Sequence, residues 1–121
     1  MNIREIEALN LPVSNLQASL RFYHEVFDLP ILELADDVKA ARLAKQLLIF
    51  SPPQEVVNPI EFSVVAKDSV AALESHLANY GVDIKQPAHT VKVMGRDATA
   101  IVVADLDDNL ITINTYAQKG G

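Results

Sequence analysis

Residues 9–31 read LNLPVSNLQASLRFYHEVFDLPI, and this stretch decides the fold of the chain. Apolar residues alternate at its start, which predicts a strand within residues 6–13. Ser14 and Gln17 then match the capping-box pattern that begins a helix. The helix should end at the Asp-Leu-Pro sequence of residues 28–30. Its apolar face is expected to consist of Leu16, Leu20, Tyr23 and Phe27.

Residues 55–84 repeat the pattern of residues 2–31. Corresponding positions of the two copies carry similar side chains: Leu9 and Phe62, Leu11 and Val64, Ala18 and Ala71, Leu20 and Leu73, Phe27 and Tyr80, Leu29 and Val82, and Ile31 and Ile84. A second helix is therefore expected, with Asp68 or Ser69 as its N-cap and Gly81 at its end. An internal repeat of this length predicts two similar structural modules.

The two modules are expected to be joined by the Ser-Pro-Pro-Gln sequence of residues 51–54, so that module one spans residues 1–53 and module two spans residues 54–121. Further short strands are predicted at residues 31–34, 38–43, 47–51, 59–65, 99–104 and 110–115. This order of elements predicts an α+β fold, in which the two modules form a curved mixed sheet with helices outside and a cup inside. Such a cup is the usual ligand site of a small α+β protein.

The composition is that of a single globular domain without cysteine chemistry. Of the 121 residues, 50% are hydrophobic and 21% are charged, which suffices for a real core. The absence of cysteine excludes disulfides, thiolate nucleophiles and cysteine-based metal clusters. The 10 Lys and Arg residues are scattered among 16 Asp and Glu, which argues against nucleic acid as a partner. The sequence has no apolar run of membrane-spanning length and no signal-peptide pattern, so a cytoplasmic protein is expected.

Two motifs together resemble those of a known family. Residues 9–16, followed by the Ser-Leu-Arg-Phe-Tyr sequence of residues 19–23, resemble the first strand and helix of the vicinal oxygen chelate superfamily. That superfamily comprises glyoxalases, bleomycin resistance proteins and extradiol dioxygenases. Residues 105–111, which read DLDDNLI, resemble its Asp-Pro-Asp-Gly-Asn-Leu-Ile turn. The resemblance implies two βαβββ modules whose cup is often completed by a second chain, and therefore a homodimer.

The resemblance also implies a divalent metal ion, held by His, Gln or Glu on four strands. In this chain those positions fall at Ala8, Leu48, Pro59 and Thr112, none of which is a good metal ligand. A shift of the alignment by one residue introduces Glu7, Asn58 and Glu61 but no histidine. We therefore expect no metal and no other cofactor. The chain therefore resembles most the metal-free drug-resistance branch, whose members sequester cationic antibiotics in the cup.

Strand alternation indicates which side chains line the cup. Five polar residues and two apolar residues are expected there: Asn10, Glu61, Ser63, Thr112 and Asn114, with Leu48 and Phe50 as apolar contacts. Glu61 is the strongest candidate, because its carboxylate suits a cation or the role of a general base. These residues also suit water-facing strand surfaces, and Leu48 and Phe50 equally suit the buried core. The leading hypothesis is a binding protein for a small organic molecule, with cationic molecules as first candidates.

The three histidines and the aspartate-rich turn receive other interpretations. His24 and His76 fall within the expected helices and point away from the cup. His89 falls in residues 86–97 with Lys92 and Arg96; this segment is expected to be either a lid that contacts an anionic ligand or a solvated loop. Residues 105–109 imitate the start of a calcium loop. Leu110 and Tyr116 replace its required Gly and Glu, however, so a tight turn is expected.

Three other hypotheses remain open at this point. The first is that the chain is an enzyme of the same superfamily, namely a lyase, isomerase or dioxygenase that uses Glu61 or a non-standard metal site. The second is that it has a ferredoxin-like βαββαβ fold, in which fewer strands separate the two helices. The third is that it has lost ligand binding and serves only as a dimeric interaction module.

Overall fold

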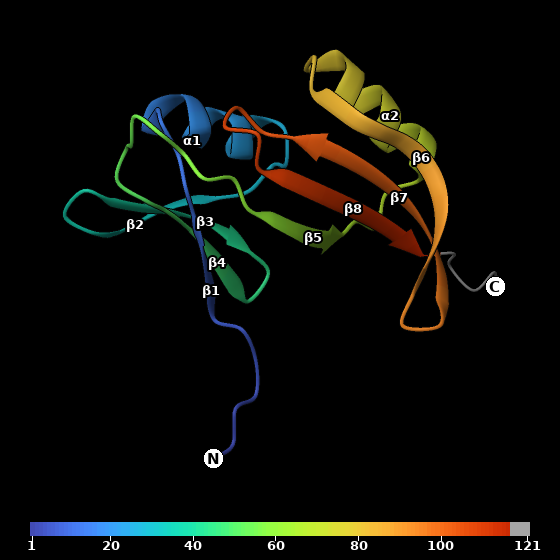
Figure 1. Ribbon diagram of the computed structural model, residues 1–121, viewed down its shortest axis with the longest axis horizontal. Coiled ribbons are helices and arrows are strands. Elements are labelled where there is room, and N and C mark those ends of the chain that lie inside the picture. Colours follow the sequence, from blue (N-terminus) through green and yellow to red (C-terminus); the bar gives the residue numbers. More distant parts are fainter. Residues whose placement is uncertain (117–121) are drawn as a thin grey trace. The chain divides into compact units, whose positions relative to one another are not determined.

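The computed structural model describes residues 1–116, and within them the chain forms two four-stranded sheets with one helix each (Figure 1). The first sheet, with its helix, comprises β1 (Ala8–Leu11), α1 (Leu16–Glu25), β2 (Ile31–Ala35), β3 (Val38–Leu43) and β4 (Gln46–Phe50). The second comprises β5 (Glu61–Val65), α2 (Val70–Asn79), β6 (Asp83–Val93), β7 (Arg96–Ala104) and β8 (Leu110–Tyr116). One compact unit ends at Pro59 and the next begins at Ile60. The predicted α+β class and the duplicated βαβββ order are confirmed.

Both sheets have the same strand order. Sheet one runs β1-β4-β3-β2 and sheet two runs β5-β8-β7-β6. The first strand of each module pairs in parallel with the last one, and the remaining pairs are antiparallel. Three strands follow α1 before the second module begins, so the ferredoxin-like hypothesis, which requires fewer strands between the helices, is wrong. The cup expected between the two modules stays a prediction.

The helices begin at hydrogen-bonded caps. Asn15 caps α1, since its Oδ1 accepts the backbone N–H of Ala18 at 3.1 Å. The predicted capping box at Ser14 is therefore displaced by one residue, and Asn serves this role as well as Ser. Ser69 caps α2 by accepting the N–H of Ala72 at 3.1 Å, and Gly81 follows the helix with a φ of 63°, as expected.

The Asn15 cap leads to a first testable result. Replacing Asn15 by Ala should lower the free energy of unfolding by about 1 kcal/mol, because the N–H of Ala18 loses its acceptor. Asn15→Ser is the matched control and should stay close to wild type, since Ser is also a good cap. Urea unfolding followed by circular dichroism measures the difference. A larger loss of unfolding free energy in Ser14→Ala than in Asn15→Ala would show that Ser14 is the N-cap.

The core of module one is centred on Tyr23 of α1. This side chain is 0% exposed, and its ring lies 5.6 Å from that of Phe50 on β4, centroid to centroid. Phe22 and Phe27 surround it at 5.2 and 5.5 Å. Leu11 on β1 pairs with Phe50 and is also fully buried. The sheet face that carries Leu11 and Phe50 is thus the one that α1 covers.

The prediction that residues 86–97 form a lid or a solvated loop is wrong. Residues 83–93 form the long strand β6, which pairs along its length with β7. Met94 and Gly95 connect the two strands with φ angles of 50° and 81°, which matches the two-residue hairpin turns that suit the twist of paired strands. Polar residues interrupt the apolar alternation of this segment, and two bulges before His89 shift its register. These features conceal the strand in the sequence.

The aspartate-rich turn ties β5 to β8. Asp105 Oδ1 accepts the backbone N–H groups of Asp107 and Asn109 at 2.9 and 3.0 Å, and its Oδ2 accepts Asn109 Nδ2 at 2.9 Å. Asn109 Oδ1 in turn accepts the N–H of Ile60 at 2.9 Å. The expected tight turn is confirmed; the carboxylate of Asp105 orders it, and Asn109 holds the residue that precedes β5.

Neither helix within residues 1–116 has both the length and the apolar character of a membrane-spanning segment.

Candidate functional site

Strand register brings three of the predicted site residues together on one face of sheet two. Ser63 of β5 pairs with Thr112 of β8, and Thr112 pairs with Val102 of β7. Cross-strand partners point to the same side of a sheet, and every second residue of a strand shares that side. Glu61, which is two residues before Ser63 on β5, therefore lies on this face as well. The predicted alternation of β5 and β8 is correct.

The helix α2 covers one side of sheet two (Figure 1). A hollow of about 420 Å³ is lined by the start of α2 and by Thr90, Thr99 and Thr115, which alternate with the residues of the first face; Ala98 and Tyr116, near the strand ends, also border it. Ile111 and Ile113 are buried on the same side as these threonines. We therefore call the side that carries Ser63 and Thr112 the helix-free face.

A hollow of about 590 Å³ lies on the helix-free face. Its lining residues are Glu61, Phe62, Ser63, Lys85, Gln86, Val102, Leu110 and Thr112. Apolar contact is available from Val102 and Leu110, and hydrogen bonds are available from the hydroxyls of Ser63 and Thr112. This combination, together with the volume, is typical of a pocket for a small molecule.

One basic and one acidic side chain border this hollow, Lys85 and Glu61, and only Lys85 forms an ion pair. Lys85 Nζ lies 2.8 Å from Asp83 Oδ2, and the hydrogen bond and negative charge of Asp83 raise the pKa of Lys85. The Glu61 carboxylate is exposed and forms no ion pair with any other residue in the described range 1–116. Glu61 is therefore the acidic group of the hollow that is available to a ligand.

Asn114 lies on the helix-free face one row beyond Thr112. Its β7 partner is Ala100, and Ala100 pairs with His89 of β6. The Asn114 side chain is buried, and its Oδ1 has no hydrogen-bond partner within residues 1–116. His89 was expected in a loop but lies on this face. Its signal in the sequence was the alternation of His89, Val91 and Val93, which share this side of β6.

The predicted residues of module one divide between two faces. Asn10 is exposed and pairs with Ile49. Leu48 and Phe50 are 4% exposed and pair with Leu9 and Leu11 on the face that α1 covers. The prediction that Leu48 and Phe50 share a face with Asn10 is therefore wrong. Both residues belong to the core of module one.

The repeat also corrects two of the expected metal positions. Because Leu9 corresponds to Phe62, Ala8 corresponds to Glu61, and the Asn10–Ile49 pair corresponds to the Ser63–Thr112 pair. Pro59 precedes β5, and Leu48 faces α1. The strand positions equivalent to the expected ligands are thus Ala8, Ile49, Glu61 and Thr112.

These residues do not fit the metal ion that the resemblance implies. Module one contributes two aliphatic side chains at the equivalent positions, and module two contributes one carboxylate and one neutral hydroxyl. A divalent ion held by protein requires more His, Cys or carboxylate donors than this. Within residues 1–116, no group of three or more His, Cys, Asp or Glu side chains is placed to hold a metal ion.

The comparisons with known proteins agree with this architecture. A family model described as Glyoxalase/Bleomycin resistance protein/Dioxygenase superfamily matches residues 5–113. A virulence protein from Salmonella typhimurium is similar over 97% of this chain and 100% of its own, with 22% identity and a TM-score of 0.85. Fosfomycin resistance protein FosX from Mesorhizobium loti is similar over 97% and 95%, with 15% identity and a TM-score of 0.73. Lactoylglutathione lyase from Agrobacterium tumefaciens is similar over 94% and 95%, with 17% identity and a TM-score of 0.71. At these identities the structural likeness shows the fold.

Proposed function

Because the chain belongs to the glyoxalase/bleomycin resistance protein/dioxygenase superfamily, we propose that it binds a small organic molecule in the hollow of sheet two, without the metal ion used by enzymes of that superfamily. The observation that carries this proposal is the meeting of Glu61, Ser63 and Thr112 in that hollow. Solved structures with the same fold include both a resistance protein and a lyase, so the fold itself does not choose between binding and catalysis.

The residues of the hollow favour a ligand with a cationic group. The Glu61 carboxylate attracts positive charge. Asp83 forms an ion pair with the ammonium group of Lys85, which reduces the repulsion between Lys85 and a bound cation. The hydroxyls of Ser63 and Thr112 orient the ligand, because each can donate or accept a hydrogen bond. Val102 and Leu110 contact its apolar part. We propose that binding, rather than chemical conversion, is the principal activity of this site.

A catalytic role for Glu61 is the second candidate function, and the same hollow favours it. An exposed carboxylate on the edge strand β5, on the same face as the hydroxyls of Ser63 and Thr112, can take a proton from a bound molecule that lies within hydrogen-bond distance. Lyase, isomerase and dioxygenase activities belong to this alternative. A turnover that is lost in Glu61→Gln would establish it, whereas turnover retained in that variant would exclude the base role.

Exchange of Glu61 for Gln tests the binding proposal directly. We expect about fivefold weaker binding of cationic ligands, equivalent to ~1 kcal/mol, which is the upper end for an exposed ion pair. Binding of neutral ligands of the same shape should change little. A thermal-shift screen of amines, each paired with an uncharged alcohol or amide of the same shape, selects ligands, and isothermal titration calorimetry then measures their binding to wild type and to Glu61→Gln.

Glu74→Gln is the matched control for this experiment. Glu74 is an exposed residue of α2, so this variant has the same change in net charge without a change in the hollow. Equal loss of affinity in the two variants would mean that only the overall charge matters and would contradict a site at Glu61. Elemental analysis of the purified protein is the complementary measurement. Near-stoichiometric zinc, nickel, manganese or iron would overturn the metal-free part of the proposal.

The homodimer implied by the resemblance stays a prediction, as does the cytoplasmic location. Light scattering of the eluted protein after size-exclusion chromatography measures the mass in solution. A mass close to twice 13.2 kDa would support the dimer, and a mass of 13.2 kDa at high protein concentration would contradict it.

A further inference from the structure

The β6 side of the hollow on the helix-free face is formed by an irregularity in the strand. Ile84 and Gln86 pair with the adjacent residues Val103 and Val102 of β7. Lys85 is therefore an extra residue, which has no pairing position on β7. In a regular strand consecutive side chains point to opposite faces, whereas a bulge redirects one of them. For this reason Lys85 and Gln86 both line the hollow. Bulges often lie beside functional sites, where they direct a side chain toward a ligand.

One row of side chains crosses the hollow from β5 to β6. It runs from Ser63 through Thr112 and Val102 to Gln86, and all four residues line the hollow. Hydroxyls lie toward β5, an amide lies on β6, and the aliphatic side chain of Val102 lies between them. Neighbouring strands are ~4.8 Å apart, so the Cα atoms at the two ends of the row are separated by about 14 Å. A ligand that fills this row is elongated and has a polar group at each end.

The two ends of the hollow differ in charge. Glu61 gives the β5 end a negative charge. At the β6 end, the hydrogen bond to Asp83 and the charge of Asp83 raise the pKa of Lys85, and the charge of Asp108 adds to this effect. A ligand carboxylate at the β6 end would therefore approach other carboxylates, and a second ammonium group would approach Lys85. A neutral polar group avoids both repulsions.

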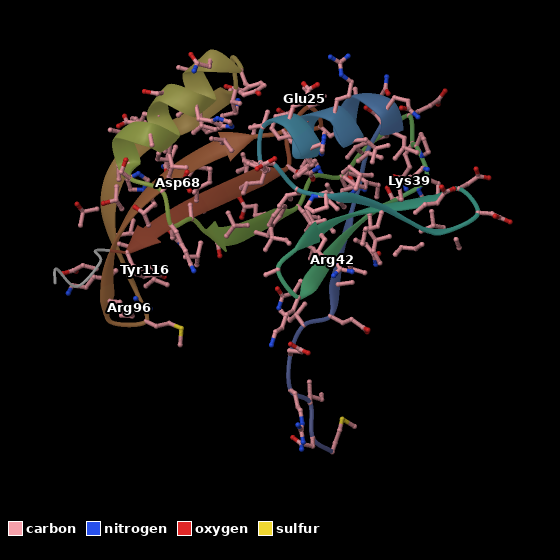
Figure 2. All side chains as sticks on the ribbon, turned by 180° about the vertical axis from the view of Figure 1, so that it is seen from behind. Glu25, Lys39, Arg42, Asp68, Arg96 and Tyr116 are labelled. Atoms are coloured by element: carbon pink, nitrogen blue, oxygen red, sulfur yellow. The ribbon has the colours of Figure 1, made fainter. Side chains whose placement is uncertain are left out.

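Arg96, another cation of the helix-free face, lies outside the hollow. Its Cζ is 4.0 Å from the centre of the Tyr116 ring, where β7 begins and β8 ends (Figure 2). Arg96 precedes Val102 by six residues of β7. At ~3.3 Å per residue, this separation is about 20 Å. Arg96 therefore does not contact a molecule that is bound at Gln86.

We propose that Gln86 binds a carboxamide at the far end of an elongated amine whose ammonium group lies at Glu61. This inference rests on the proposed function and specifies its ligand class. The side-chain amide of Gln86 both donates and accepts, so it forms two reciprocal hydrogen bonds with a ligand carboxamide. A carboxylate only accepts, so it leaves the carbonyl oxygen of Gln86 without a donor and also approaches Asp83. The ligand is therefore an amine with a terminal amide, rather than a simple amine or an amino acid.

The test compares ε-aminocaproamide, ε-aminocaproate and hexylamine, which have the same number of carbon atoms and differ only at the end away from the amine. Isothermal titration calorimetry should show that wild type binds the amide about fivefold more tightly than either of the other two compounds, because only the amide forms both hydrogen bonds with Gln86. Glu61→Gln should weaken the binding of all three compounds, since each has the same ammonium group.

Gln86→Ala should remove the preference for the amide. Its affinity for ε-aminocaproamide should fall about fivefold, to that of hexylamine, and its affinity for hexylamine should stay unchanged. Gln17→Ala is the matched control, because Gln17 is an exposed residue of α1 in module one, and it should change none of the three affinities. Gln86 is also exposed, so both variants should fold as wild type does, which circular dichroism checks.

The outcomes separate this inference from the proposed function. If wild type binds the amide and hexylamine equally and Gln86→Ala binds as wild type does, the role of Gln86 is wrong and the site at Glu61 stands. Tighter binding of ε-aminocaproate than of the amide would overturn the amide class and make the β6 end a carboxylate site. If none of the three compounds binds at millimolar concentration while other amines bind in a manner that depends on Glu61, the ligand class is wrong and the proposed function stands. If Glu61→Gln changes the binding of no small molecule in the screen, both proposals are wrong.

Discussion

Replacing Tyr23 by Ala should lower the free energy of unfolding by about 3–5 kcal/mol, the range for removal of a fully buried aromatic side chain. Tyr23 is 0% exposed and contacts the rings of Phe22, Phe27 and Phe50. Its loss leaves a cavity between α1 and β4 that the surrounding rings fill only in part. Urea unfolding followed by circular dichroism measures the change from the midpoint and the slope.

Tyr80→Ala is the control for this variant. Tyr80 of module two corresponds to Phe27 in the repeat and is 50% exposed, so its removal should cost less than about 1 kcal/mol. A double-mutant cycle between Tyr23→Ala and Phe50→Ala should show a coupling of ~1 kcal/mol, as expected for an edge-to-face ring pair. Similar losses in Tyr23→Ala and Tyr80→Ala would contradict the central place of Tyr23 in the core.

The second large effect is expected at Asp105. Replacing Asp105 by Ala removes the acceptor of two backbone N–H groups and of Asn109 Nδ2, and both Asp105 and Asn109 are buried. We expect a loss of about 3 kcal/mol in the free energy of unfolding, since hydrogen bonds to a charged acceptor are the stronger ones and buried groups without partners are costly. Thermal unfolding by scanning calorimetry measures this loss.

Asp108→Asn provides the comparison within the same turn. Asp108 has a φ of 62°, a conformation that Asn tolerates as well as Asp does, so this variant should stay within about 0.5 kcal/mol of wild type. Asp105→Ala should also weaken ligand binding at temperatures where it remains folded. Asn109 would lose the partner that orients it toward Ile60, the residue before Glu61. Unchanged stability in Asp105→Ala would mean that the turn is ordered by other contacts.

Local patterns were sufficient to predict the helices and most of the strands. The periodic apolar residues and the caps of α1 and α2 lie close together in the sequence, so their effects are local. The alternation of β5 and β8 likewise placed Glu61, Ser63 and Thr112 on one face. The strand β6 escaped prediction because polar residues and bulges interrupt its alternation.

Pairing between distant strands could not be derived in the same way. The register of β1 against β4 decides whether Asn10 lies on the same sheet face as Leu48 or as Ile49. A shift of this register by one residue exchanges the two faces. That register is set by the packing of Tyr23 and Phe50 under α1, which no local pattern contains. The unpaired oxygen of Asn114 is a property of the folded environment and has no counterpart in the sequence.

The parallel pairing of the first and last strand in each module has a consequence for biosynthesis. Hairpins such as β6–β7 join neighbouring segments and can form early. In contrast, β5 can pair only after β8 has been synthesised, and β8 is the last strand of its module. Until then, the backbone groups by which β5 pairs with β8 remain available to other chains. We expect the charge of Glu61 and the polarity of Ser63 on β5 to lower the tendency of the nascent chain to aggregate before β8 is made, in addition to any contact with a ligand.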